Sequence, residues 1–251
     1  MTRMSGVALL AVAAGLVALG RAEAKSVTSR GTGELPLLAT YPLSVAEPSD
    51  LTINETGTTL WTVTNHPARV YQLDSEGKTV KTLDFVGEDL EGIAYDRSDH
   101  TLWVAEENRR EIIHLDLDGG VLSRHALDLV GEKNCGIEGL CLDGQGRMFA
   151  LNEKRPGLFI ELGGDKSIMA RRELMFAKDY SGMAADRKHD GFWIVSDKSQ
   201  ELILWSPRAG VLKEYRLPFA KAEGVAVDHA AKRIYIVSDS EQKLYVYRLR
   251  D

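Results

Sequence analysis

The sequence has few cysteines, a small net charge and, beyond its first residues, no long hydrophobic run. Two cysteines in 251 residues, Cys135 and Cys141, exclude a disulfide-rich scaffold, and their spacing does not match a CxxC metal or redox site. They leave two interpretations open: one buried and one loop cysteine, or a local disulfide. The formal charge of −6, with no evident basic cluster, argues against a nucleic-acid partner.

Helical periodicity and the common catalytic motifs are also missing. No segment of about 12 residues clearly repeats apolar residues at helical spacing. The six histidines show no metal-ligand spacing, and neither a G-x-S-x-G elbow nor a phosphate-binding glycine loop is present. These absences count against a helical fold, a zinc site and the most recognisable hydrolase and nucleotide-binding motifs.

Residues 1–24 have the pattern of a secretory signal peptide. Arg3 precedes an apolar run over residues 7–20, and an A-x-A cleavage pattern follows at residues 22–24. At about 14 residues the run is shorter than the ~20 needed to span a bilayer, so we expect cleavage and export to the periplasm or cell envelope. The alternative is an uncleaved segment that anchors the chain in the inner membrane. After cleavage we expect no transmembrane span, and residues 25–34 should be a flexible N-terminal segment.

A six-residue motif recurs five times through the rest of the chain. Its copies start 42, 47, 43 and 42 residues apart, a period typical of repeat architectures. The copies are SDLTIN from Ser49, EGIAYD from Glu91, EGLCLD from Glu138, SGMAAD from Ser181 and EGVAVD from Glu223. A second apolar stretch follows each hexad: TLWTVTN, TLWVAEE, RMFALNE, GFWIVSD and RIYIVSD.

The repeat predicts an all-β fold, a β-propeller of five four-stranded blades over residues 35–251. Short runs of β-branched and aromatic residues, separated by Asp, Asn and Gly turns, predict four strands in each copy. The last copy offers only three strands, so we expect residues 35–44 to supply its outer strand and close the ring. Six blades are the alternative, although no stretch of blade length is left for a sixth.

Aligning the copies places polar residues at two positions, seven of the ten being carboxylates. One position begins the hexad and the other ends the following strand. Because these strands are antiparallel, both positions should surround one mouth of the central channel. The first column is Ser49, Glu91, Glu138, Ser181 and Glu223, and the second is Asn65, Glu107, Glu153, Asp197 and Asp239.

Carboxylates crowded at one opening repel one another, and a hard cation would offset that repulsion. Oxygen-only ligands suit calcium, so we predict a calcium site formed by Glu91, Glu138, Glu153 and Glu223. The other positions are predicted to bind a ligand: Ser49, Asn65, Glu107, Ser181, Asp197 and Asp239. The two hexads that begin with serine make the ring uneven, so the cation should lie off the axis toward the second and third blades.

A structural role for these acids is the alternative. Acids at strand ends often accept backbone N–H bonds or pair with neighbouring bases, here Arg109, Lys154, Arg155 and Lys198. The glycine at the second hexad position would then provide dihedral freedom for a tight turn. The Asp or Asn that ends each hexad should begin a turn at the opposite face, and the aromatic residue shared by the second stretches should pack between blades.

Several segments of the chain resemble the SdiA-regulated (YjiK-like) family of bacterial envelope proteins. These are TVTNHPARVYQLDSEG, DLEGIAYD, NCGIEGL and AEGVAVD with IYIVSD. The resemblance covers residues 36–251 and implies a TolB-like or NHL-like propeller, more distantly similar to phytase-like propellers that bind calcium around the channel. The family's Glu-Gly pairs match at Glu91, Glu138 and Glu223, and its cysteine matches Cys135, whereas Cys141 is particular to this chain. The resemblance implies fold and location more than activity.

These features predict an exported, monomeric, non-enzymatic propeller that binds a cation and a small ligand or envelope protein at its acidic mouth. One alternative is a metal-dependent hydrolase of phosphate or carboxylic esters, phytase-like or lactonase-like, in which Glu138 or Glu153 is general base toward a metal-bound water. No basic phosphate-binding set for a phytase is apparent in the sequence. The other alternative is a purely structural scaffold.

Overall fold

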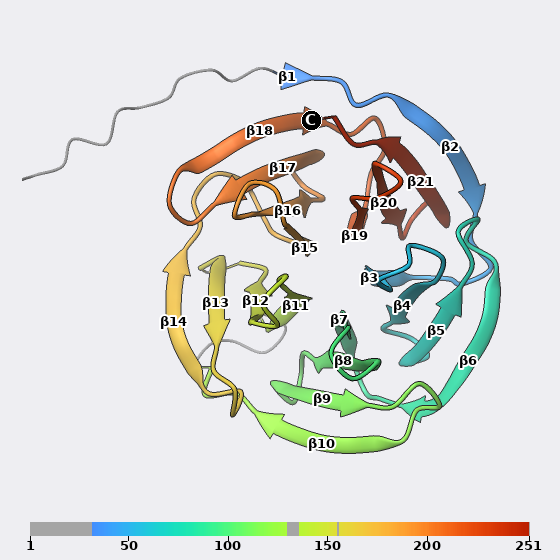
Figure 1. The fold of residues 1–251 in the computed structure, drawn as a ribbon, viewed down its shortest axis with the longest axis vertical. Helices are drawn as coiled ribbons and strands as arrows, with labels where there is room; N and C mark the ends of the chain where they lie inside the picture. The colour runs from blue at the N-terminus through green and yellow to red at the C-terminus, as the bar shows by residue number, and fades with distance from the viewer. Residues whose placement is uncertain (1–31, 130–135, 155, 251) are drawn as a thin grey trace, which may run out of the picture.

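A computed structural model describes residues 32–129, 136–154 and 156–250, which fold as a five-bladed β-propeller (Figure 1). Four-stranded sheets radiate from a central axis, with one strand of each sheet beside the axis and one at the circumference. The described residues contain no helix, and so none that could cross a bilayer. The all-β propeller predicted from the repeat is confirmed, with five blades rather than six.

Each blade is an antiparallel sheet whose strands follow the chain from the axis outward. Blade 1 contains β3 (Pro48–Ile53), β4 (Leu60–Thr64), β5 (Arg69–Leu73) and β6 (Thr79–Val86). Blade 2 contains β7 (Leu90–Asp96), β8 (Thr101–Glu106), β9 (Glu111–Leu115) and β10 (Val121–Ala126). Blade 3 contains β11 (Ile137–Leu142), β12 (Met148–Asn152), β13 (Leu158–Leu162) and β14 (Ile168–Glu173). Blade 4 contains β15 (Gly182–Asp186), β16 (Gly191–Ser196), β17 (Glu201–Ser206) and β18 (Gly210–Arg216).

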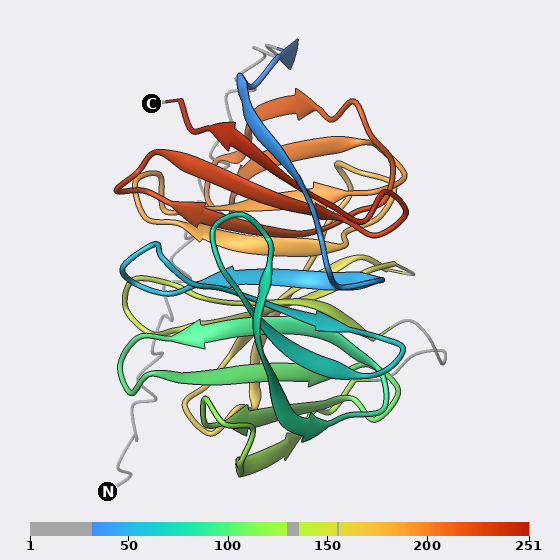
Figure 2. The ribbon, with the colours of Figure 1, turned by 90° about the vertical axis from the view of Figure 1, so that its right-hand side faces the viewer.

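Blade 5 closes the ring with strands from both ends of the chain. Its inner strands are β19 (Ala222–Asp228), β20 (Arg233–Ser238) and β21 (Lys243–Arg248), and β2 (Leu37–Pro42) pairs antiparallel with β21. Figures 1 and 2 show β2 along the outer edge of this blade, where the sequence predicted it. A short strand, β1 (Thr32–Gly33), pairs parallel with β18, so these two residues of the expected flexible segment belong to the sheet of blade 4. The predicted leader and residues 25–31 lie outside the described residues.

Matched aromatic side chains pack between blades, as the repeat predicted. Trp61, Trp103, Phe149, Trp193 and Tyr235 are all buried. Trp61, for example, shares a hydrophobic cluster with Ile93 and Tyr95 of the next blade. Burying one such side chain contributes roughly 1.5–3 kcal/mol, and the ring repeats that contribution at each blade contact.

The hexad's last residue begins a turn at the face opposite the mouth, again as predicted. Asp96, Asp143, Asp186 and Asp228 each accept a backbone N–H two residues ahead, and Asn54 accepts one from Thr58. These bonds fix the hairpin between the first and second strands of every blade.

The second hexad position explains how the axis is filled. Four blades have glycine there, and blade 1 has Asp50, which is fully buried. Its Oδ1 accepts the N–H of Leu51 at 2.8 Å, and its Oδ2 accepts those of Ile93 at 2.9 Å and Leu140 at 3.4 Å. Burial raises the pKa of this carboxyl, and the three N–H groups oppose that rise. One side chain thereby ties the inner strands of blades 1, 2 and 3 together.

The four glycines serve close packing, which corrects the expectation of dihedral freedom. None of Gly92, Gly139, Gly182 and Gly224 has a positive φ. A Cβ on Gly182 would lie 2.3 Å from the carbonyl oxygen of Glu223, and one on Gly224 would lie 2.5 Å from the nitrogen of Leu51. At Gly182 and Gly224 the inner strands thus approach one another too closely for a Cβ atom, whereas at Gly92 and Gly139 a Cβ would be tightly packed, at 3.1 and 3.2 Å from its nearest neighbours.

Asp50 and the glycines lie between the space at the mouth and a small cavity of about 50 Å³ on the other side, which polar residues such as Thr52 and Arg97 help to line. Cys141 lines that cavity as a buried free thiol, and burial raises its pKa. Cys135 lies outside the described residues.

Candidate functional site at the acidic mouth

A β-bulge turns the first column of polar residues toward the mouth. In blades 1, 2, 3 and 5 the pairing register shifts around the residue that begins the hexad. The unpaired residues are Ser49, Glu91, Glu138 and Glu223. A bulge leaves one residue outside the ladder and redirects its side chain. The same local feature in these four blades therefore aims a carboxylate or hydroxyl at the opening.

The second column follows directly after the second strand of each blade, as the sequence predicted. Pro48 pairs with Thr64 and Leu90 with Glu106, so the start of the first strand and the end of the second lie side by side. Nine of the ten predicted positions line one cavity of about 380 Å³: Ser49, Asn65, Glu91, Glu138, Glu153, Ser181, Asp197, Glu223 and Asp239. The tenth, Glu107, is buried and belongs to a carboxylate cluster with Glu91.

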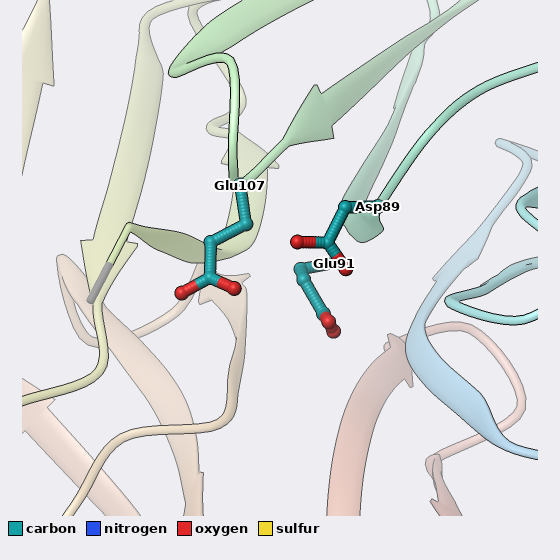
Figure 3. Close-up of side chains that lie close together, drawn as sticks. All are labelled: Asp89, Glu91 and Glu107. Carbon is teal, nitrogen blue, oxygen red and sulfur yellow. The ribbon is translucent and has the colours of Figure 1, made fainter. Parts of the chain in front are cut away.

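Three carboxylates converge in blade 2 (Figure 3). Asp89 and Glu91 flank the start of β7, and Glu107 follows β8. One oxygen from each lies within 4.8 Å of the others, a separation that a single cation can bridge. The N–H of Glu107 donates to the carbonyl of Asp89 at 2.9 Å, which fixes the two backbones relative to each other.

Burial and the neighbouring carboxylates favour the protonated forms of Asp89 and Glu91. Burial, with the neighbouring charges of Asp89 and Glu107, raises the pKa of Glu91 to about 8, although hydrogen bonds from Ser49 and Asn65 oppose the rise. Burial and the carboxylate of Glu107 also raise the pKa of Asp89. A cation bound beside Asp89 and Glu91 would therefore favour their charged forms.

The surrounding hydrogen bonds position the cluster and leave one acceptor unused. The Asn65 amide donates to Glu91 Oε1 at 2.5 Å, the Asn108 amide donates to Asp89 Oδ2 at 2.5 Å, and the N–H of Gly136 donates to Glu107 Oε1 at 2.9 Å. Asn65 Oδ1 is buried and has no hydrogen-bond partner in the described part of the chain. An oxygen-only set with an unsatisfied buried amide oxygen fits a hard cation.

The opposite side of the mouth carries lysines. Lys154 pairs with Glu153, and Lys198 lies 3.3 Å from Glu153 and 3.5 Å from Asp179. Lys221 bridges Asp197 at 3.4 Å and Glu223 at 3.3 Å. Two of the bases expected to neutralise acids, Lys154 and Lys198, do so here.

The other two bases named with them do not join the mouth. Arg109 contacts Glu88 and Glu106, away from the mouth columns, and Arg155 lies outside the described residues. Lysines thus occupy the side of blades 3 to 5, and among the described residues of blades 1 and 2 no lysine or arginine lines the cavity.

The two serines in the first column support the glutamates that follow them. Ser49 hydrogen-bonds to Glu91 and Ser181 to Glu223. Glu138 has neither such a serine nor, among the described residues, another hydrogen-bond partner. Burial, with the charges of Glu91, Glu107 and Glu223, raises its pKa well above the ordinary value.

The four predicted metal ligands do not form one cluster. Glu91 joins Asp89 and Glu107, whereas Glu153 and Glu223 pair with lysines. Glu138 lies near enough to Glu91 and Glu107 for their charges to affect its own. Glu107, which we expected to be a ligand-binding position, is therefore in the candidate cation site.

Sequence reasoning missed Asp89 and Asp179, both of which are buried. Each lies two residues before a hexad, and blade 1 has Glu47 at the same position. Extending the alignment by two residues would have revealed this third acidic column. Asp179 accepts the Ser196 hydroxyl at 2.5 Å, so it supports the adjoining loop.

A family model described as SdiA-regulated matches residues 41–248. The chain belongs to the SdiA-regulated family. This confirms the resemblance drawn from the sequence and agrees with the propeller fold.

Solved structures share the architecture at low sequence identity. A glutaminyl cyclase from Myxococcus xanthus has a TM-score of 0.68 and 15% identity, over 87% of this chain and 100% of that one. A gluconolactonase from Xanthomonas campestris has a TM-score of 0.56 and 15% identity, over 86% and 99%. A protein of unknown function from Bacteroides caccae has a TM-score of 0.57 and 9% identity, over 83% of each chain. At these identities the similarity concerns the fold alone.

Proposed function

We propose that this propeller binds a divalent cation at Asp89, Glu91 and Glu107, and through it a small ligand at the mouth. The observation that carries the proposal is the convergence of the three carboxylates within 4.8 Å, beside the unsatisfied Asn65 Oδ1. A bound cation would neutralise charges that burial otherwise penalises. It would also supply a Lewis-acidic centre open to the cavity.

Calcium is the cation we propose first. It takes about 6–8 oxygen ligands, and carboxylates with an amide oxygen supply that chemistry without cysteine. The cluster provides three carboxylates, with the Asn65 amide hydrogen-bonded to one of them, so water or a ligand would complete the shell. This leaves room for a ligand to coordinate the cation directly.

The ligand we propose carries an anionic group. Its anion would bridge the cation in blade 2 and the lysine side of the mouth, where Lys198 and Lys221 are about half exposed. A cavity of about 380 Å³ suits a small molecule. The same lysines would supply the basic side chains that a calcium-dependent phosphate site requires, a set that the sequence alone did not place together.

Calorimetric titration with CaCl₂, after chelator treatment, tests the cation site. We expect heat, a higher Tm and affinity that rises with pH, because binding displaces protons. Glu91→Gln and Glu107→Gln should weaken binding at least tenfold. Glu173→Gln, an exposed acid on β14, removes the same charge and should change nothing. If the native protein shows no heat and no Tm shift, the proposal is wrong. Parallel titrations with Mg²⁺ and Zn²⁺ identify the preferred metal.

Ester hydrolysis is a second candidate because Glu138 lies beside the cluster with a raised pKa and no hydrogen-bond partner among the described residues. Such a carboxylate can act as a general base toward a cation-bound water. Screening lactones, aryl esters and phosphomonoesters with calcium tests this, and turnover should vanish in Glu138→Gln while calcium binding persists. If no compound of these classes is hydrolysed, binding is the only function that we propose.

We further propose that the protein is exported and acts in the periplasm or cell envelope, on the strength of the leader pattern in residues 1–24. N-terminal sequencing of the protein recovered from producing cells tests this. A mature chain that begins at Lys25 is expected, and an intact leader would favour the anchored alternative.

A further inference from the structure

A second cavity, of about 890 Å³, opens between blades 3 and 4, at the end of the strands that is away from the mouth. The β11–β12, β15–β16 and β17–β18 turns line it, and these turns lie at the face opposite the mouth. The outer strand β14 forms its side wall. No residue of the cavity belongs to the site described above.

Three phenylalanines from both blades form its floor. Phe149 and Phe159 come from blade 3 and Phe192 from blade 4, and all three are buried. Their ring centroids lie 5.2 Å (Phe149 to Phe159), 4.9 Å (Phe149 to Phe192) and 4.7 Å (Phe159 to Phe192) apart. This packing makes the floor rigid and apolar.

Five arginines from four segments surround the floor, although they are scattered along the sequence. They are Arg147, Arg171, Arg172, Arg187 and Arg208. Their convergence is a product of the fold, which is why the sequence appeared to lack a basic cluster.

Two of the five guanidinium groups face carboxylates. Arg147 pairs with Asp143 at 2.7 Å, and its guanidinium also lies 5.5 Å from the Phe149 ring. Arg208 approaches Asp190 at 3.8 Å, but these side chains are 89% and 68% exposed, so the pair is weak.

The other three have no ion pair with any described residue. Arg171 donates to the carbonyl of Asp128 at 2.6 Å and Arg172 to that of Pro207, so neutral acceptors position both groups. The Arg187 side chain is exposed and has no ion pair within the described residues.

The remaining acids of the cavity do not balance these charges. Asp186 is buried and already accepts the Trp193 indole N–H at 2.7 Å and the backbone N–H groups of Lys188 and His189. Asp186 keeps its charge, so five guanidinium groups line the cavity against four carboxylates: Asp143, Glu161, Asp186 and Asp190. The cavity is therefore positively charged on a protein whose formal charge is −6.

We propose that this cavity binds an organic anion with an apolar body, such as an aryl or acyl carboxylate, sulfonate or phosphate. Guanidinium forks recognise such anions with paired hydrogen bonds, and the phenylalanine floor would contact the apolar part. The volume matches the upper range of small-molecule sites. The site is independent of the cation site at the mouth, and its ligand need not be the same.

The test uses 8-anilinonaphthalene-1-sulfonate as a fluorescent probe of the full chain, with benzoate and phenyl phosphate as competitors. We expect saturable binding that weakens as salt is raised, and displacement by both competitors. The double variant Arg172→Gln/Arg187→Gln should lose at least tenfold in affinity. The matched double variant Arg216→Gln/Arg248→Gln removes the same charge at exposed positions outside the cavity and should bind like the native protein.

Two further variants distinguish a loss of probe affinity in the cavity from a general effect on folding or charge. Arg172→Lys/Arg187→Lys retains the charge without the fork and should bind at an intermediate level, with an unfolding midpoint that checks its folding. Glu91→Gln should leave probe binding unchanged. Absence of saturable binding, or equal affinities in the cavity and matched double variants, would overturn the proposal.

Discussion

At the scale of residues, the departures from the repeat carry much of the chemistry. Asp50 replaces glycine in one hexad of five and fills the axis, where the other four blades have no side chain. Ser49 and Ser181 replace glutamate and support the glutamates of the blades that follow. Substituting the repeat's consensus residue at these three positions would therefore remove contacts rather than improve them.

Gly182→Ala tests the packing at the axis. The new Cβ would meet backbone atoms of blade 5, which cannot move as a side chain can, so we expect a loss of about 1–3 kcal/mol of unfolding free energy or more. Gly164→Ala is the matched control, because nothing lies within 4 Å of its Cβ position, and it should stay within about 0.5 kcal/mol. Urea denaturation measures both, and equal midpoints would contradict the packing explanation.

At the scale of elements, two features of the strands position the residues of the site. The bulge at the start of the inner strand aims the first column, and antiparallel pairing brings the second column beside it. Strand β2 then completes blade 5 and holds blades 1 and 5 in one ring. The mouth depends on that closure because it contains residues of all five blades.

Removing the chain through Pro42 should open the ring. The deletion takes away β2, leaves β21 as an exposed edge, and costs about 1 kcal/mol for each lost ladder bond in addition to buried contacts. We expect a large fall in Tm and self-association, measured by thermal unfolding and light scattering. Removal through Gly33 deletes β1 but keeps β2 and should leave a monomer of nearly native Tm, so similar behaviour of the two truncations would contradict the role of β2.

At the scale of the whole molecule, buried acids at the mouth couple stability to pH. Burial raises the pKa values of Glu91, Glu138 and Glu223. A raised carboxyl pKa stabilises the folded state where the group is protonated. For Glu91 that stability is complete below the ordinary pKa of 4.5 and is lost as pH rises through about 8.

Glu91→Gln should therefore gain Tm relative to the native protein as pH rises from about 5 to 8 in the presence of chelator. A gain of about 1 kcal/mol in unfolding free energy corresponds to a rise of about 2–4 °C in Tm for a chain of this size. Glu173→Gln should show no such trend, and a Tm difference for Glu91→Gln that is constant across pH would contradict the shifted pKa. Saturating calcium should abolish the advantage of the variant, because the native carboxylate then has a cation.

Much of the fold was predictable because it follows from local pattern. The period of the hexads, the turn residues after Asp96 and its equivalents, and the missing fourth strand of blade 5 each have a direct sequence signal. The ring of polar residues at the mouth was predictable for the same reason, since antiparallel pairing alone brings the columns together.

The details of the site depended on contacts that no local pattern encodes. Asp89 lies outside the hexad, and only the fold shows that it meets Glu107. Lys221 binds Glu223, which removes that acid from any shared cation site. The five arginines between blades 3 and 4 come from segments up to 61 positions apart, such as Arg147 and Arg208, and sequence proximity cannot reveal them.

The buried Asp50 bonds across the axis between the mouth and the small cavity on the other side, and this has a consequence for access. The two cavities are separate spaces. We therefore expect a small molecule that enters at the acidic face to leave by the same face. A surface that covers this face would then slow both uptake and release.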